Sequence, residues 1–437
     1  MPHEVVIGLF IAWFILFLVA GQTVCTVLWG AGLIGIVLWT GPATIISFMQ
    51  ADVYWKAATY SLITVPLFIL MAQFLMIGDL VKDVYALVYK LSGQRRYPLG
   101  ALTMVFGGFL GAVSGAATAI ASAMALIASP LLRSYGYSKD FSISIAAAAG
   151  SLSEIVPPAI ILIVYGCLVE IPIGRLFAGA IIPGVLATLS LMLVLYLMGR
   201  KMKGTTAPPQ VTATELAKVR VSSSLVSIIV LVVIMGVIFG GIFSGTITAT
   251  EAGGIASFVA FIAIAAMRRL TWPKLKDALL TTVNITALVM IIVFGAQFFG
   301  RFMSLSMIPR QLVLLLDPIM HQPYLVLFLL LLIFFILGMI LESVAAMIMA
   351  LPVIIPIVNV LGLDPLWFGV LACYTIAVGL ITPPVGLAVY AAAGAAKVPV
   401  EEVFRYDLVF AVATMVIVMP LLVIFPELVT FLPSLMR

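Results

Sequence analysis

The sequence consists of successive apolar segments, most of them long enough to cross a lipid bilayer as a helix. A transmembrane helix needs about 20 consecutive apolar residues, whereas a transmembrane β-barrel shows alternating apolar and polar residues. The apolar runs in this chain are continuous, and they cover approximately residues 4–20, 23–49, 53–79, 98–132, 140–170, 175–199, 222–242, 247–267, 275–303, 323–357, 365–396 and 403–432. The sequence therefore predicts an all-α polytopic membrane protein.

The composition narrows the class of function. With 64% hydrophobic and 9% charged residues, the chain has more apolar surface than a soluble core can bury, so a lipid bilayer is its expected environment. The net charge of +5 reflects loop topology in such a protein, and no nucleic-acid partner is expected. The three cysteines and two histidines are scattered, with neither metal-ligand spacing nor a triad-like set. The chain is therefore not predicted to be an enzyme.

The basic residues predict the orientation in the membrane. Of the 22 Lys and Arg residues, 17 fall in the segments 82–96, 133–139, 200–220, 268–276 and 397–405. The positive-inside rule places these segments in the cytoplasm, which works only if segments 98–132 and 323–357 are re-entrant helical hairpins. The prediction is then about eleven transmembrane helices, two re-entrant hairpins and two periplasmic termini. The alternative, two ordinary long tilted spans, stays open.

The two halves of the chain are related by a constant offset of 226 positions. At this offset Pro130, Gly136, Pro157 and Pro158 coincide with Pro356, Gly362, Pro383 and Pro384. Because the two predicted hairpins open to opposite sides, the pattern predicts an inverted-topology repeat. Secondary transporters use this architecture, and their binding sites lie at the bilayer midplane between the repeats.

The predicted organisation therefore has two repeats and a linker. The first repeat, 1–200, comprises scaffold helices 1–79, an arm 80–97, a hairpin 98–132 and a broken helix 140–170. Residues 201–221 form a cytoplasmic linker. The second repeat, 222–437, comprises scaffold helices 222–267, an arm 304–320, a hairpin 323–357 and a broken helix 365–396.

The motifs SEIVPP at 153–158 and GLITPP at 379–384 predict breaks within two of the helices. Proline cannot donate a backbone hydrogen bond and disfavours helix at the residue before it. Each span should therefore split into two half-helices, with free carbonyls at one end and free amides at the other. Carbonyls suit a hard cation such as Na⁺, and amides suit a carboxylate. For this symmetric set we favour a transport site over packing kinks.

Several motifs resemble the large membrane subunit of tripartite ATP-independent periplasmic (TRAP) transporters. They are SGAATAIASAMALIASPLLRSYGY, AGSLSEIVPPAIILIVYG, LFAGAIIPG, TATEAGGIAS, GMILESVAAMIMALPVIIP, LGLDPLWFGV and GLITPPVGLAVY. The resemblance implies an elevator-type secondary transporter in the bacterial inner membrane. It implies import of an organic anion, such as a carboxylate or a sialic acid, coupled to about two sodium ions. It also implies two partners, a small four-helix membrane subunit and a soluble periplasmic substrate-binding protein.

The resemblance also assigns candidate site residues. One sodium site would use Ser114, Ser153, Val156 and Pro158, mostly through backbone oxygens, and the internal repeat places a second near Gly338, Gly379, Thr382 and Pro384. The candidate substrate contacts are Ser114, Gly115, Glu154, Pro158, Arg301, Glu342 and Thr382. Glu342 would either hold the second hairpin tip or add charge near the second ion.

Two residues leave alternatives open. The family usually has a small residue where this chain has Ser153-Glu154, and serine where it has Ala159. Glu154 would therefore pair with Arg301, favour a substrate with an amine or many hydroxyls, or face the scaffold. Arg301 lies inside apolar sequence and has two possible roles. It would either contact the anion, or lie at the membrane interface with its side chain extended to the surface.

Rival functions also remain. The main one is a stand-alone sodium- or proton-coupled elevator carrier that needs no binding protein. A channel is disfavoured because symmetric hairpin tips suit alternating access.

Overall fold

In the computed structural model, the described residues are 8–9, 12–13, 16–17, 20–49, 54, 58–92, 95–114, 116–201 and 221–436. Every regular element within these ranges is helical, which confirms the predicted all-α class. Most of the predicted linker lies outside the described residues, as do both ends of the chain.

The helices follow one another in this order: α2 (Val24–Thr40), α3 (Ala43–Phe48), η2 (Tyr60–Ile63), α5 (Thr64–Ile77), α6 (Leu80–Leu91), α7 (Arg96–Ser114), α8 (Ala117–Ser134), α9 (Lys139–Leu152), α10 (Ile160–Val169), α11 (Ile173–Lys201), α13 (Val221–Met235), η3 (Gly236–Gly240), α14 (Gly241–Phe243), α15 (Ala249–Ala266), α16 (Trp272–Ser306), α17 (Ile308–Met320), α18 (Pro323–Ile340), α19 (Ser343–Val360), α20 (Pro365–Gly379), α21 (Leu387–Ala396), α22 (Val400–Ile424) and α23 (Glu427–Ser434).

Nine helices within the described ranges are long and apolar enough to cross a membrane. They include α8, α18 and α19, which fall in the segments predicted as hairpins, and they leave out the shorter apolar helices α2, α10, α20 and α21. The chain is thus a polytopic membrane protein. The count of about eleven full spans stays a prediction.

Helix bounds repeat along the chain at the offset seen in the sequence. The bounds of α18 to α21 lie within one residue of those of α7 to α10 shifted by 226 positions. Packing follows the same rule, since α7 contacts α9 as α18 contacts α20, and α8 contacts α21 as α19 contacts α10. At the centre, the Ser151 hydroxyl donates to the carbonyl of Ala377, its counterpart in the other half, at 2.5 Å. Contact between counterparts is expected where a local twofold axis passes nearby.

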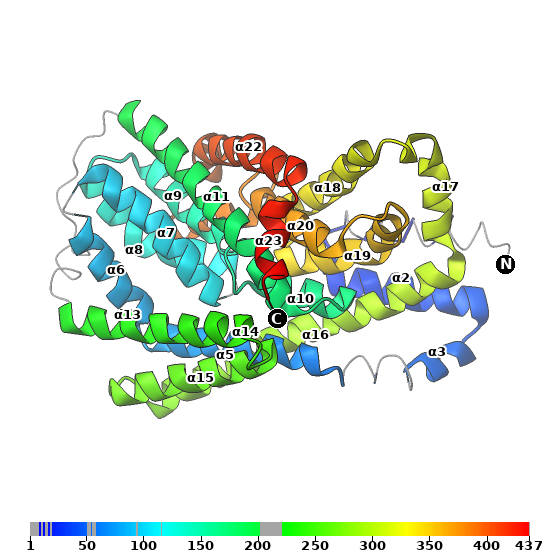
Figure 1. Cartoon of the computed structure of the whole chain (residues 1–437), viewed down its shortest axis with the longest axis horizontal. Coiled ribbons are helices and arrows are strands. Elements are labelled where there is room, and N and C mark those ends of the chain that lie inside the picture. Colours follow the sequence, from blue (N-terminus) through cyan, green and yellow to red (C-terminus); the bar gives the residue numbers. More distant parts are fainter. Residues whose placement is uncertain are drawn as a thin grey trace.

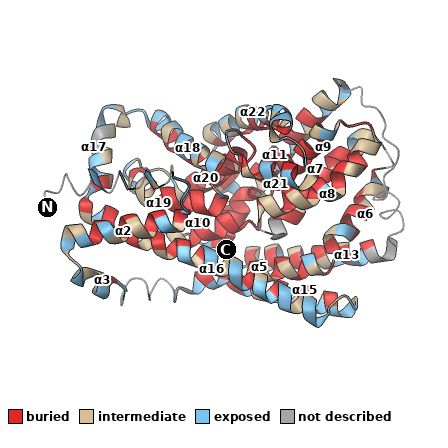
Figure 2. Cartoon of the chain, turned by 180° about the vertical axis from the view of Figure 1, so that it is seen from behind, coloured by how far each residue is buried: buried red, intermediate tan, exposed pale blue. Residues whose placement is uncertain are grey.

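The helices are arranged in two groups. In Figure 1, α2, α5, α13, α15 and α16 run along one side, and the broken helices with α11 and α22 lie on the other. Burial is greatest where the broken helices cross, because all residues of α20 after its first are buried, and in α9 all but its first two (Figure 2). By contrast, α15 and α16 have one buried face and one exposed apolar face, the pattern of a helix that meets lipid or a partner helix.

Both arm helices begin after a sharp turn. Asp79 precedes α6 with φ 56°, and Met307 precedes α17 with φ 55°. The first arm is also anchored by polar contacts. The Arg269 guanidinium contacts the Asp83 carboxylate at 2.6 Å and donates to the Gly78 carbonyl at 2.7 Å. Ser227 of α13 donates to the same carboxylate at 2.8 Å. These contacts fix the start of α6 against α13 and the turn before α16.

Candidate functional site

The first break separates α9 from α10 and is almost fully buried. Ser153 and Glu154 are each 1% exposed. Their amides turn back to the carbonyls of Gly150 and Ser151, both at 3.1 Å, so the chain leaves the helix within one turn. The following Pro157-Pro158 pair supplies no amide hydrogen. Helix resumes at Ile160 without a side-chain cap, so the first amides of α10 are available to a ligand.

The second break, between α20 and α21, has the same form. The Thr382 amide turns back to the Gly379 carbonyl at 2.9 Å, and Pro383 and Pro384 follow. α21 also begins without a side-chain cap. Here the break is tied to the helix pair α18–α19, because the Gly386 amide donates to the Met339 carbonyl at 2.9 Å. The predicted breaks therefore exist at both places.

Two predicted sodium-site glycines meet where α18 crosses α20. A Cβ atom on Gly338 would lie 2.7 Å from the Ile376 carbonyl oxygen. One on Gly379 would lie 2.7 Å from the backbone carbon of Gly338. Small residues allow helix backbones to approach closely in membranes. These glycines are therefore explained by close packing.

The first half has a similar crossing between α7 and α9. A Cβ atom on Gly111 would collide with the Cβ atom of Ser153. The Ser153 hydroxyl donates to the Gly150 carbonyl at 2.6 Å, which leaves its oxygen lone pairs for a cation. Of the other residues predicted for this site, Val156 is half-buried and Pro158 is buried. Gly115 and the side chain of Ser114 lie outside the described residues.

Glu154 links the broken helix to the tips of both helix pairs. Its carboxylate accepts a hydrogen bond from the Ala117 amide, at the start of α8, at 3.2 Å. The same carboxylate interacts with Ser343 and Glu342, at the start of α19. Segments far apart in sequence thus converge on one buried carboxylate, and the sequence gives no local indication of this convergence.

Glu342 caps the second tip. Its carboxylate accepts from the amides of Val344 and Ala345, at 3.0 and 3.4 Å, and from the Ser343 hydroxyl at 2.8 Å. These bonds satisfy the free amides at the start of α19. The structure thus gives Glu342 the tip-holding contacts that were one of its two expected roles.

Arg301 lies apart from this cluster. It is exposed on α16, with its guanidinium 5.7 Å from the centre of the Phe48 ring. Among the described residues, the groups that interact with Glu154 include Ala117, Glu342, Ser343 and Cys373. Pairing with Arg301, one of the three alternatives for Glu154, is not among these contacts.

A cavity of about 280 Å³ lies between α10, α16 and α19. Gln297, Gly300 and Ser304 of α16 contribute to one wall, and Ile348 and Pro352 of α19 contribute to the opposite one. From the sequence, Gln297 is a polar residue within an apolar run that would either line the cavity or, with preference, form hydrogen bonds in the core. That it lines a cavity together with α19 follows from long-range packing.

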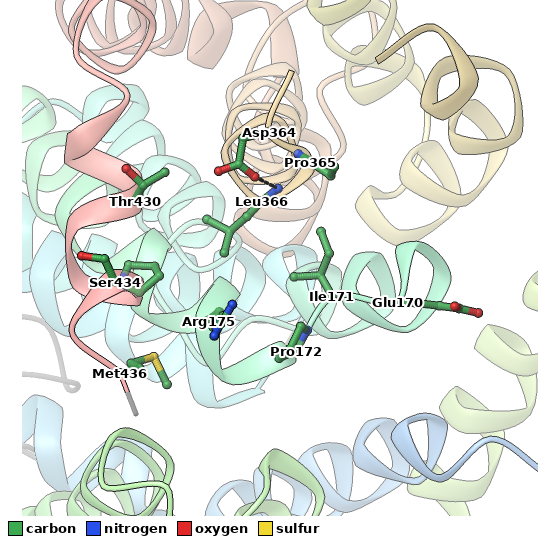
Figure 3. Close-up of a pocket in the computed structure, with 11 residues that line it drawn as sticks. Glu170, Ile171, Pro172, Arg175, Asp364, Pro365, Leu366, Thr430, Ser434 and Met436 are labelled. Atoms are coloured by element: carbon green, nitrogen blue, oxygen red, sulfur yellow. Dashed lines mark hydrogen bonds between the residues drawn. The ribbon is translucent and has the colours of Figure 1, made fainter. Parts of the chain in front are cut away.

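Sequence reasoning missed a further pocket, which lies at the turn between α10 and α11 (Figure 3). Its volume is about 410 Å³, and Arg175 and Asp364 lie across it from one another. The Asp364 carboxylate caps α20 by accepting from the Leu366 amide at 2.8 Å. An adjoining pocket of about 580 Å³ shares Glu170 and Arg175 and extends toward the start of α15. The sequence indicated this pocket only through its charged residues, which are Glu170 and Arg175 at the junction of α10 and α11 and Asp364 before α20.

The described residues contain no group of three or more His, Cys, Asp and Glu side chains that could hold a metal ion. Any cation at the breaks would therefore be held mainly by carbonyl and hydroxyl oxygens. Such oxygens suit an alkali-metal ion, whereas tightly bound zinc takes nitrogen and sulfur ligands.

Comparisons with known proteins agree with this geometry. The chain is 29% identical to the 2,3-diketo-L-gulonate TRAP transporter large permease protein YiaN of Escherichia coli, over 85% of this chain and 87% of that protein. It is 29% identical to the sialic acid TRAP transporter large permease protein SiaM of Vibrio cholerae, over 90% and 91%. It is 27% identical to the C4-dicarboxylate large permease protein DctM of Pseudomonas aeruginosa, over 86% and 85%.

Solved structures share the fold at low sequence identity. The YdaH transporter of Alcanivorax borkumensis aligns with a TM-score of 0.62 and 14% identity, over 95% of this chain and 98% of that one. Neisseria gonorrhoeae MtrF aligns with a TM-score of 0.64 and 13% identity, over 96% and 94%. At such identities the likeness concerns the fold alone.

A family model described as "Tripartite ATP-independent periplasmic transporter, DctM component" matches residues 11–428. The match includes both breaks and both helix pairs. The chain therefore belongs to the DctM component family of TRAP transporters, a family of transporters and not of enzymes.

Proposed function

We propose that this chain is the large membrane subunit of a sodium-coupled secondary transporter that imports an organic anion by an elevator mechanism. The observation that carries the proposal is the pair of matched helix breaks, each packed against a helix pair and related by the same offset. In this proposal the pairs α7–α8 and α18–α19 are re-entrant hairpins that open to opposite sides of the inner membrane.

The chemistry of the breaks supports cation and anion binding in one place. Unpaired backbone groups cost several kcal/mol each in a bilayer, so they persist where they line a site. We assign one sodium site to the oxygens of Ser114, Ser153, Val156 and Pro158. The second sodium site uses those of Gly338, Gly379, Thr382 and Pro384. The carboxylates of Glu154 and Glu342 add negative charge beside these sites.

The substrate class follows from the relatives. Those named above transport 2,3-diketo-L-gulonate, sialic acid or C4-dicarboxylates, all organic anions. The uncapped start of α10 offers amides to a carboxylate, whereas at α21 the amides of Ala388 and Val389 already donate to the carbonyls of Leu380 and Gly386. Arg301 lies one turn after Gln297, which lines the cavity between α16 and α19, and we retain Arg301 as an anion contact.

Two partners complete the proposed system. One is a small membrane subunit that extends the scaffold, and the other is a periplasmic protein that delivers the substrate. A relative from Oleidesulfovibrio alaskensis is named an isethionate TRAP transporter permease DctMQ, and this chain covers 61% of that protein. The length difference is consistent with a second permease component carried on the same polypeptide in that relative.

Uptake into proteoliposomes tests the proposal. Coupling of about two sodium ions to a monoanion makes uptake electrogenic, worth about 2.3 kcal/mol per 100 mV for each net charge. We expect uptake to require an inward sodium gradient and the binding protein, and to increase when the lumen is made negative. Uptake that depends on neither the sodium gradient nor the voltage would contradict sodium coupling. Undiminished uptake without the binding protein would instead favour the stand-alone carrier.

A further inference from the structure

One buried acidic residue takes no part in the site described above. Asp407 lies on α22, about 10 Å along the helix from its start at Val400. Its side chain belongs to the buried stripe of that helix, which otherwise consists of Val403, Phe410, Ala411, Thr414, Val418 and Leu422. Asp407 is 0% exposed, so it occupies a position where this pattern calls for an apolar residue.

The Asp407 carboxylate lacks hydrogen-bond partners. Among the described residues, neither of its oxygens has one, and both are shielded from solvent. The Ser144 hydroxyl of α9 faces it, yet that hydroxyl also forms no hydrogen bond. Two buried polar groups therefore face each other across the α9–α22 contact without satisfying one another.

No charged residue on the contacting helices neutralises this carboxylate. α22 packs against α9, α11, α20, α21 and α23. In the described ranges, the charged residues on these six helices other than Asp407 are Lys139, Asp140, Arg175, Arg200, Lys201, Glu401, Glu402, Arg405 and Glu427. All but Arg405 lie near the helix ends, and Arg405 is exposed. The neutral titratable side chains are Tyr196, Cys373, Tyr374, Tyr390 and Tyr406. Within the described residues, Ser144 is the polar side chain that lies near enough to influence the Asp407 carboxyl group.

An ionised carboxylate in such surroundings is too costly to persist, so it must acquire a proton or a cation. Hard cations take about six oxygen ligands, and Asp407 with Ser144 supplies at most three. A proton needs one. We propose that Asp407 and Ser144 form a buried proton-binding site at the α9–α22 contact, separate from the sites at the helix breaks.

Infrared difference spectroscopy of the full chain in lipid nanodiscs tests this site without depending on transport. The wild-type spectrum is expected to contain the carbonyl stretch of a protonated carboxylic acid at mildly acidic pH. Buried Glu154 also contributes to this band. Asp407→Asn should therefore reduce its intensity, and the matched control Asp277→Asn, at an exposed residue of α16, should leave the intensity unchanged. A wild-type spectrum without the band, or a band of equal intensity in D407N and wild type, would overturn the proposal.

Thermal unfolding gives a second readout. The folded chain would hold a proton that the unfolded chain releases, so wild-type stability should fall as pH rises. D407N should weaken this dependence, to which buried Glu154 also contributes, and D277N should keep it. The proposal would be contradicted by a pH dependence of stability that is equal in D407N and wild type, or by a stability that depends on sodium concentration instead of pH. If D407N does not fold, Ser144→Ala decides, because loss of the neighbouring hydroxyl should shift the band, and an unchanged band would remove Ser144 from the site.

Discussion

At the scale of single residues, Glu154 is the one whose role the structure changes most. Its carboxylate accepts from the Ala117 amide and interacts with Ser343, so it holds the starts of α8 and α19 beside the first break. A buried amide that loses its acceptor costs about 1–3 kcal/mol. We therefore expect Glu154→Ala to lower sodium-driven uptake roughly 10-fold or more, whereas Glu154→Gln, which keeps an acceptor, should lower it less.

Uptake at limiting sodium, in proteoliposomes, measures both variants. Glu402→Ala is the matched control, because Glu402 is exposed in the first turn of α22. If Glu154→Gln were as inactive as Glu154→Ala, the charge of Glu154 would matter and not its acceptor. Wild-type uptake in Glu154→Ala would remove the residue from the site.

Site residues were predictable where their role depends on the backbone at their own position, and not where it depends on contacts with distant parts of the chain. The prolines and glycines of the two breaks follow from backbone chemistry, so sequence motifs alone place them at 153–158 and 379–384. Glu154 stood out only as a departure from the family pattern. Its partners lie elsewhere in the chain, and no residue spacing encodes them.

At the scale of helices, close crossings position the breaks. Gly338→Ala would push a Cβ atom against the backbone of Ile376, which cannot move without displacing α20. Such overpacking costs about 1–3 kcal/mol. We expect a lower thermal midpoint and reduced uptake for this variant. Gly394→Ala in α21 is the control, because its Cβ atom would meet no atom within 4 Å. Equal behaviour of the two variants would rule out a tight crossing.

The polar anchor of the first arm makes a second helix-scale prediction. Arg269→Ala removes the ion pair to Asp83, whose side chain is 7% exposed, while that of Arg269 is 24% exposed. We expect a loss of about 1–3 kcal/mol, since breaking a buried pair is costly and the partly exposed arginine reduces the effect. Thermal unfolding measures it, with the exposed neighbour Arg268→Ala as control. A loss no larger than that of the control would show that other contacts hold α6.

Helix positions were more predictable than helix contacts. Apolar length, proline and glycine are local properties, and they placed α7 to α10 and α18 to α21 close to their observed bounds. The Asp83–Arg269 pair and the pocket at Arg175 and Asp364 join segments separated by about 190 positions each. Composition and spacing carry no information on such contacts, so they could not be predicted.

At the scale of the whole molecule, the repeat explains why the two broken helices contact each other. Each helix pair packs on the broken helix of its own half, and its second helix also packs on the broken helix of the other half. The halves are therefore interlaced at the centre, where Ser151 meets Ala377. A movement of either tip would be transmitted to both breaks, as alternating access at a midplane site requires.

The inverted orientation of the halves is the last prediction, and it can be tested without a substrate. Ser134 ends α8, and Val360 ends α19 as its counterpart at the offset of 226. If the repeats are inverted, these residues lie on opposite sides of the membrane, with Ser134 in the cytoplasm beside Arg133. Single cysteines at the two positions, in a chain whose three native cysteines are replaced, can be treated with a membrane-impermeant thiol reagent. We expect Val360→Cys to be labelled in intact cells and Ser134→Cys only after the membrane is opened. Labelling of both from the same side would show parallel repeats, and the two hairpins would then open in the same direction.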